Sequence, residues 1–201
     1  MKLTLLALLL AGCTTFKIDP VQTVKAAEFK ITCGEGSGSG ILLEGGKILT
    51  ASHVVGSGTS CTASTEGRVS YPLKVGKNSP EVDLATLEFI GEKPPVKGIP
   101  LAKQNPPQYT FVYIMGHPLG FDTQVLTSGA YQGDLDKLEV PGIALVTAPI
   151  TFGNSGGPVI AIENGHPVLI GIVDAIPASQ NSPTYHLGLV VNLETIKAFL
   201  K

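Results

Sequence analysis

Hydrophobic positions come in short runs separated by turns rich in glycine, proline, serine and aspartate. Short apolar runs between turn residues are typical of β-strands, and none before the C-terminus keeps the 3.6-residue period of a helix. The first group of runs predicts strands at 29–33, 41–43, 47–51, 60–65, 71–75 and 84–89. The second group predicts strands at 110–115, 124–131, 143–147, 158–162, 168–173 and 186–191.

The segments between these runs divide the chain into two similar halves. Residues 34–40 are expected to form a glycine-serine turn, Gly45-Gly46 a tight hairpin, and the proline-rich stretch 91–107 a connector. Asn192 is expected to cap a short C-terminal helix at 193–200. The pattern predicts an all-β fold of two antiparallel six-stranded β-barrels, at about 28–92 and 108–192, with a short C-terminal helix.

Composition narrows the function classes. The chain has 201 residues, of which 43% are hydrophobic and 15% charged, so it can bury a sizeable core. Its net charge of −2, without a basic cluster, argues against nucleic-acid binding. We expect no cofactor and no metal, while the oligomeric state is left open.

The N-terminus has the pattern of a targeting segment. Lys2 precedes an apolar run at 3–11 that is too short to span a bilayer, so residues 1–12 are interpreted as a signal peptide. Leu10-Ala11-Gly12-Cys13 resembles the bacterial lipobox, which implies a lipoprotein acylated at Cys13, with palmitate among its lipids, anchored in the cell envelope. Thr14 favours the outer membrane. The alternative is an ordinary secretory signal with an incidental cysteine.

An exported, lipid-anchored chain has consequences for its domain limits and for its two remaining cysteines. Residues 13–27 are expected to be a lipid-anchored tether, and residues 28–201 the folded domain. Export makes a disulfide between Cys33 and Cys61 the default, worth about 3–4 kcal/mol on the chain-entropy model. Two buried thiols are the alternative. No histidine stands at ligand spacing to suggest zinc.

The candidate chemistry centres on Gly153-Asn154-Ser155-Gly156-Gly157-Pro158. Glycine lets the backbone approach a ligand closely, so that main-chain N–H groups can meet an oxyanion beside a nucleophilic serine. Such a serine needs a histidine as base and a carboxylate to orient the ring. Of the four histidines, only His53 ends an apolar strand among small residues. The alternative interpretation is a glycine-rich turn with a solvated serine.

Six segments resemble the chymotrypsin-like serine proteases, most closely their HtrA/Deg branch. They occur in the family's order over nearly all of the expected domain: 36–41, 50–55, 83–87, 116–120, 126–129 and 153–158. The resemblance implies a serine endopeptidase with polypeptide substrates, and it places the strands of Cys33 and Cys61 side by side. Because the chain ends soon after this domain, the family's PDZ modules are expected to be absent.

The resemblance also implies individual roles. Ser155 is the expected nucleophile and His53 the general base. Asp83 orients His53, and Glu81 fits less well because the family's aspartate precedes Leu-Ala. The N–H groups of Gly153 and Ser155 form the expected oxyanion hole. His117, where the family has asparagine, is interpreted as structural.

The pocket for the residue on the acyl side of the cut is expected to be uncharged. Its predicted walls are Pro149, Ile150, Thr151 and Phe152 on one side and Leu187, Gly188, Leu189 and Val190 on the other. Small or medium apolar residues should therefore be preferred. Asp174 is the one nearby acid that could reach in and reverse this.

Two other functions remain open at this point. Gly153-Asn154-Ser155-Gly156-Gly157 also fits the nucleophile elbow of an α/β-hydrolase esterase, with Asp174 and His186 following in that order. The elbow leads into a helix, whereas Pro158 onward is predicted to be a strand. The other alternative is a catalytically silent, surface-anchored binding module on a protease scaffold.

Overall fold

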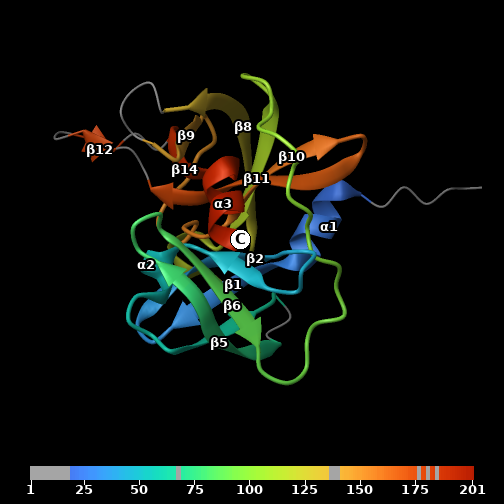
Figure 1. The fold of residues 1–201 in the computed structure, drawn as a ribbon, viewed down its shortest axis with the longest axis vertical. Helices are drawn as coiled ribbons and strands as arrows, with labels where there is room; N and C mark the ends of the chain where they lie inside the picture. The colour runs from blue at the N-terminus through green and yellow to red at the C-terminus, as the bar shows by residue number, and fades with distance from the viewer. Residues whose placement is uncertain (1–18, 67–68, 136–140, 176–177, 180–181, 184–185) are drawn as a thin grey trace, which may run out of the picture.

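Two closed six-stranded barrels make up most of the protein. The structure is a computed structural model, and it describes residues 19–66, 69–135, 141–175, 178–179, 182–183 and 186–201. In Figure 1 the first barrel, coloured blue to green, lies below the second, coloured yellow-green to red. Neighbouring strands pair antiparallel in both barrels, which confirms the expected all-β architecture.

The first barrel is closed by pairing between β4 and β1. Its strands run in the order β1-β2-β3-β6-β5-β4. Their bounds are β1 Glu28–Cys33, β2 Gly36–Leu42, β3 Ile48–Thr50, β4 Ser60–Ser64, β5 Ser70–Ser79 and β6 Leu84–Phe89.

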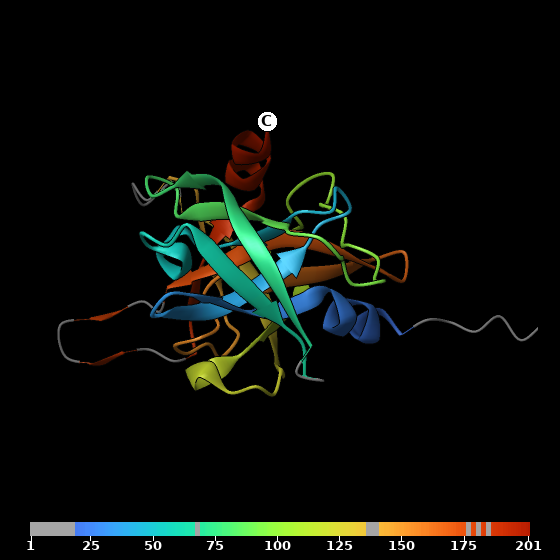
Figure 2. The same cartoon turned by 90° about the horizontal axis from the view of Figure 1, so that it is seen from below.

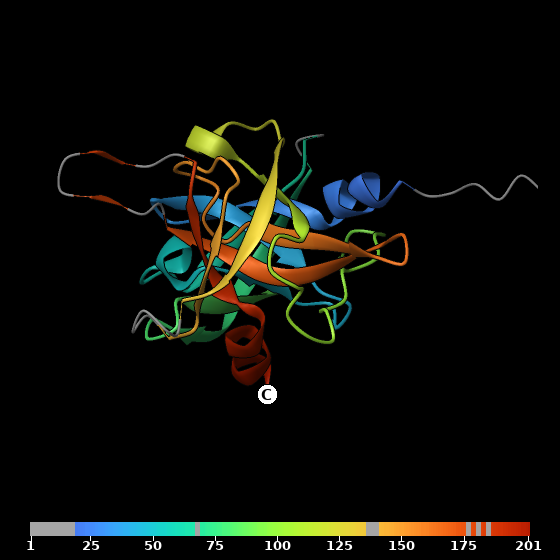
Figure 3. The same ribbon diagram turned by 90° about the horizontal axis from the view of Figure 1, so that it is seen from above.

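The second barrel is closed by pairing between β10 and β7. Its order is β10-β11-β14-β9-β8-β7. The bounds are β7 Phe111–Gly116, β8 Val125–Asp134, β9 Ile143–Val146, β10 Pro158–Glu163, β11 His166–Ala175 and β14 Gly188–Asn192. A separate hairpin of β12 (Ala178–Ser179) and β13 (Ser182–Pro183) projects away from this barrel in Figures 2 and 3.

A shared apolar core joins the barrels. One cluster of buried side chains combines residues of the first barrel, such as Phe29 and Leu87, with Leu169 and Ile172 of the second. A smaller cluster fills the second barrel. The connector at 91–107 forms no named strand and makes single bridges to each barrel, one of them through Leu101.

The expected tether is wrong for residues 20–27, which form helix α1 (Pro20–Ala27). Asp19 caps this helix by accepting a hydrogen bond from the Val21 N–H, and Pro20 occupies the first turn, where its missing N–H costs nothing. Val24 and Ala27 then lie on one buried face against the core. Cys13 and the rest of residues 1–18 lie outside the described residues.

The expected turn at 34–40 is also wrong beyond its first two residues. Strand β2 begins at Gly36 and pairs with β1 from Gly36 to Ile41. Its small residues are needed because neighbours pack directly over them: a Cβ on Gly40 would approach side-chain atoms of Ile48 to 2.8 Å. The glycine-serine composition suggested a loop, but main-chain hydrogen bonds with β1 make this segment a strand.

Two short helical segments, each following a strand, and a helix at the C-terminus complete the fold. Helix α2 (Ser52–Val55) follows β3, and the 3₁₀ turn η1 (Pro118–Gly120) follows β7. Helix α3 (Leu193–Leu200) confirms the C-terminal prediction, because the Asn192 side chain accepts from the Thr195 N–H as an N-cap. Within the described residues, every helix is too short or too polar to cross a bilayer.

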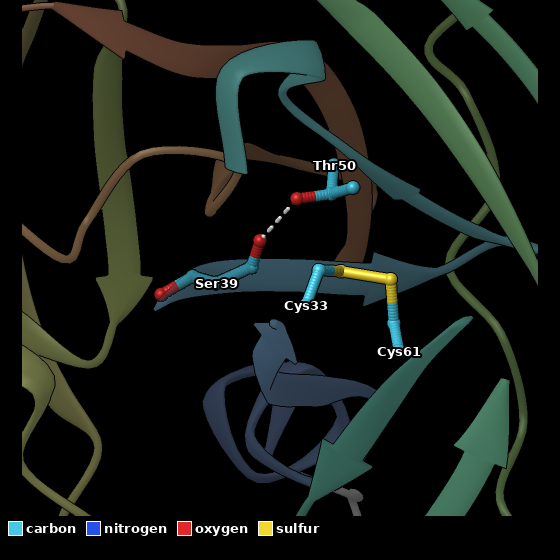
Figure 4. Close-up of a disulfide and its surroundings, with 4 residues drawn as sticks. All are labelled: Cys33, Ser39, Thr50 and Cys61. Carbon is cyan, nitrogen blue, oxygen red and sulfur yellow. Dashed lines mark hydrogen bonds between the residues drawn. A yellow bond between two sulfur atoms is a disulfide. The ribbon is translucent and has the colours of Figure 1, made fainter. Parts of the chain in front are cut away.

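The structure contains the expected disulfide between Cys33 and Cys61, which joins the paired strands β1 and β4 (Figure 4). Removing it in a Cys33→Ala, Cys61→Ala double variant is expected to lower the free energy of unfolding by about 3–4 kcal/mol, because the unfolded chain regains its loop entropy. Urea unfolding followed by circular dichroism measures this. Dithiothreitol should destabilise the wild type and leave the variant unchanged. Equal urea midpoints for both proteins would contradict the prediction.

Candidate active site

His53 and Asp83 are brought together by the pairing of β3 with β6. His53 lies in α2, just after β3, and Asp83 stands just before β6. The Asp83 carboxylate accepts two hydrogen bonds from His53, one from the main-chain N–H at 2.9 Å and one at the ring Nδ1 at 2.7 Å. Asp83 has a φ of +50°, a left-handed conformation that aspartate and asparagine tolerate better than most residues.

These contacts alter the acidities of both groups. The hydrogen bond to Asp83 raises the pKa of His53 above its ordinary value of 6.5, although partial burial works the other way. Burial works to raise the pKa of Asp83, but its hydrogen bonds with His53 outweigh burial, and that pKa lies below its ordinary value. The pair therefore favours a charged carboxylate beside a ring nitrogen that carries a proton.

Ser155 lies in the loop between β9 and β10. Gly153 and Gly156 have φ values of +91° and +81°, and a Cβ at either would collide with main-chain oxygen, of His117 and Ser39 respectively. The Ser155 hydroxyl donates to the main-chain carbonyl of Asp174 at 3.4 Å, which is a weak interaction, and no hydrogen bond to His53 is present in the described residues. The N–H groups of Gly153 and Ser155 donate to no acceptor in the described part of the chain.

Ser39, on β2 of the first barrel, joins this loop to the strand before His53. Its hydroxyl donates to the Gly153 carbonyl at 2.8 Å, and its N–H donates to the Ser155 carbonyl at 2.8 Å. Its own carbonyl accepts from the Thr50 hydroxyl at 2.7 Å, the contact drawn in Figure 4. Sequence reasoning missed Ser39 because it placed 34–40 in a turn. The resemblance at 36–41 was the available signal.

His117 supports the same loop from the second barrel. It is 1% exposed, its N–H donates to the Ser39 hydroxyl at 2.9 Å, and its Nε2 lies 3.3 Å from the carboxylate of the buried Glu28. Burial works to lower the pKa of His117, but the neighbouring Glu28 carboxylate outweighs it and raises that pKa. The following Leu119 N–H donates to the Phe152 carbonyl at 2.6 Å. These contacts agree with the structural role expected for His117.

An apolar cavity of about 260 Å³ opens beside the Ser155 loop. None of its lining residues carries a carboxylate. They are Pro118, Val125, Thr127, Pro149, Ile150, Thr151, Asn154 and His186. The expected wall residue Gly188 is not among them, but it packs against Ile150, because a Cβ there would lie 2.9 Å from the Ile150 Cδ1 atom.

Several of the expected pocket residues lie elsewhere. Phe152 is 75% exposed, and Val190 is buried in the second-barrel core, because β14 turns that side chain inward. Leu187 and Leu189 are half-buried and do not line the cavity. Asp174 does not line it either: its carboxylate lies with His53 and Asp83.

The fold excludes the α/β-hydrolase alternative. Ser155 is followed by strand β10, not by a helix, and the sheets are antiparallel barrels. Asp174 lies close to His53 instead of pairing with His186, which lines the apolar cavity.

The sequence matches the model of one protein family, described as the trypsin-like peptidase domain, over residues 38–172. The matched stretch covers β2 to β11 and includes His53, Asp83 and Ser155.

Curated relatives and solved structures give similar matches. The chain is 32% identical over 174 residues to Protease Do-like 4, mitochondrial, of Arabidopsis thaliana, covering 83% of this chain and 32% of the relative. It is 30% identical over 167 residues to Serine protease HTRA2, mitochondrial, of Bos taurus, covering 76% and 36%. The chain thus spans about a third of each of these relatives. The structure of the serine endoprotease from Yersinia pestis superposes with a TM-score of 0.74 at 20% identity, covering 90% of this chain and 63% of that one, and this likeness concerns the fold.

Proposed function

The chain belongs to the trypsin-like peptidase family, and from this premise we propose that it is a serine endopeptidase that cleaves polypeptides with a Ser155, His53 and Asp83 triad. The observation that carries the proposal is the pair of hydrogen bonds from His53 to Asp83, next to a loop that presents Ser155 between two glycines of positive φ. The similarity to Do-like and HTRA2 proteases supports the same activity.

The proposed mechanism follows from these contacts. A proton on His53 Nδ1, held by Asp83, leaves Nε2 free to take the proton of the Ser155 hydroxyl as the oxygen attacks the scissile carbonyl carbon. The carbonyl oxygen becomes an oxyanion, which the free N–H groups of Gly153 and Ser155 can stabilise. His53 then gives its proton to the leaving amine as the peptide bond breaks. Water, activated by the same ring, hydrolyses the acyl-enzyme and restores the serine.

The direct test is covalent labelling with a fluorophosphonate, which reacts with an activated serine hydroxyl. The wild type should label at one site, and Ser155→Ala should not label. Ser60→Ala is the matched control, because Ser60 is exposed on β4 outside the site and its loss should leave labelling intact. A folded wild-type protein that remains unlabelled would favour the silent binding module.

We propose further that the 260 Å³ cavity receives the side chain on the acyl side of the cut. It is lined by apolar groups, with Thr127, Thr151, Asn154 and His186 as its polar members, and no acid lines it in the described residues. Burying an unpaired lysine or arginine side chain there would cost several kcal/mol, whereas an aliphatic side chain gains by leaving water.

Cleavage of a peptide library is therefore expected after Ala, Val or Leu, at least tenfold more often than after Lys or Arg. The Thr151→Asp variant is the matched test, since it adds a carboxylate of similar size to the cavity wall and should increase cleavage after Lys. Mass spectrometry of the products measures both preferences. Wild-type cleavage mainly after basic residues would contradict the prediction, and cleavage after Glu would indicate pairing with His186.

We also propose that the protein is an exported lipoprotein, with residues 1–12 removed and Cys13 acylated at the outer membrane. The support is the lipobox-like sequence Leu10-Ala11-Gly12-Cys13. Stable anchoring in a membrane needs more than one acyl chain, and lipoproteins of this kind carry more than one. Cell fractionation of a Cys13→Ser variant tests this: the variant should leave the membrane pellet and stay active. Retention in the pellet would refute acylation as the anchor.

A further inference from the structure

Asp174 stands at an irregularity in β11. The pairing between β11 and β14 shifts in register between Val173 and Ala175, so Asp174 is the extra residue of a bulge. Bulges next to active sites commonly redirect a side chain out of the regular alternation of a strand. Here the residue is directed to the proposed triad, and its main-chain carbonyl is the acceptor of the Ser155 hydroxyl.

The Asp174 side chain lies beside two members of the proposed triad, His53 and Asp83. Its carboxylate, a carboxylate oxygen of Asp83 and a ring nitrogen of His53 lie within 4.8 Å of one another. Asp174 and Asp83 also line one water-accessible cleft of about 390 Å³. Two carboxyl groups this close share a proton more easily than they both ionise.

The electrostatic surroundings of Asp174 agree with this. Burial, together with the hydrogen bond and charge of Asp83, raises the pKa of Asp174 to about 6. Among the described residues, the ionisable groups that face it are Asp83 and Glu81 from the turn before β6 and His53 from α2. Glu81 is exposed and accepts from the Ser79 hydroxyl, so water screens its effect. Residues 141–143 and Thr195, which also line the cleft, have no charged side chain.

We propose that Asp174 is a positioning residue of this active site, one that hydrogen-bonds Asp83 through its carboxyl group and sets the pH range in which His53 can act as a base. The proposal rests on the proposed function, since it concerns the same triad. In its protonated form Asp174 donates to Asp83 and leaves one negative charge beside His53. Once ionised, it adds a second negative charge, which favours the protonated ring.

The sign of the effect on activity follows. His53 must be neutral to take the proton of Ser155, and each negative charge beside it postpones its deprotonation to higher pH. As the pH rises, Asp174 loses its proton before or together with the His53 ring. The negative charge on Asp174 therefore moves the onset of activity to higher pH. The protein should be weakly active under mildly acidic conditions and gain activity towards neutral and alkaline pH.

The Asp174→Asn variant separates charge from hydrogen bonding, because its amide can still donate to Asp83 without ionising. The pKa of His53, followed by NMR in a Ser155→Ala background, should fall by about one unit, the lower end of the effect of an opposite charge at 4–6 Å. The onset of fluorophosphonate labelling should move to lower pH by the same amount. Glu81→Gln, the matched control, should change neither.

Asp174→Ala tests the positioning role. It should lower the pKa of His53 in the same way, but at the pH optimum it should label about tenfold more slowly than Asp174→Asn, because it lacks the donor to Asp83 that the asparagine amide supplies at every pH. An unchanged His53 pKa in both variants would overturn the inference. Asp174→Ser supplies a smaller donor if the asparagine variant does not fold. The NMR titration needs no catalysis, so a wild type that never labels would refute the proposed function and leave this inference to be decided separately.

Discussion

Replacing Ser155 by alanine is expected to lower turnover of a peptide substrate by about 10⁶-fold while the protein stays folded. The loss is this large because the nucleophile, base and orienting carboxylate act as a unit, and removing one leaves the others without a reaction to promote. Stability should change little, because the hydroxyl makes one long hydrogen bond, at 3.4 Å to the Asp174 carbonyl, and its main-chain contacts with Ser39 remain.

The measurement is kcat on a quenched fluorescent peptide, with the thermal unfolding midpoint recorded beside it. Ser60→Ala is again the control and should retain wild-type kcat. A Ser155→Ala protein that cleaves at the wild-type rate would end the assignment of the nucleophile.

Asp83→Asn is expected to lower kcat by about 10⁴-fold through the tautomer of His53. The asparagine amide would donate to Nδ1, and the ring proton would then sit on Nε2, where it blocks acceptance of the serine proton. The substitution keeps the backbone, since asparagine tolerates the φ of +50° at this position. Alanine there would add backbone strain to the loss of the carboxylate, and it is a poorer probe.

Glu81→Gln is the matched control for this change. Glu81 is the other acid of the same turn, but it is exposed and accepts from Ser79, so its loss should leave kcat within twofold of wild type. A reversed order of effects, with Glu81→Gln the inactive variant, would exchange the proposed roles of the two carboxylates.

The sequence predicted those features that depend on local pattern. Eleven of the twelve barrel strands were anticipated within four residues at either end, β2 begins five residues earlier than expected, and His53 meets Asp83 as the resemblance implied. Helix α1 was missed although Asp19-Pro20 is a helix-start pattern, because the segment has only a narrow apolar face, of which Val24 and Ala27 are buried.

The missed site residues depend on contacts between distant segments. Ser39 acts on a loop more than a hundred positions away, and only the resemblance at 36–41 pointed to its segment. Asp174 was expected near the specificity pocket, because a bulge that redirects one side chain cannot be read from an apolar run such as 168–173. Phe152 and Val190 were expected to line the pocket and do not, for a similar reason. The direction of a side chain on a curved strand depends on how the whole barrel closes, which the local sequence does not reveal.

The contacts of Ser39 bear on when the protein acquires its activity. Ser39 belongs to the first barrel, and the Gly153 and Ser155 carbonyls that it binds belong to the second, 114 positions further on in the case of Gly153. Such contacts form late, because the chain must first close a long loop. A chain whose first barrel forms ahead of the second can therefore assemble His53 and Asp83 before Ser155 is held beside them. On the proposed mechanism, such a partly folded chain would lack its nucleophile until the second barrel has docked against the first.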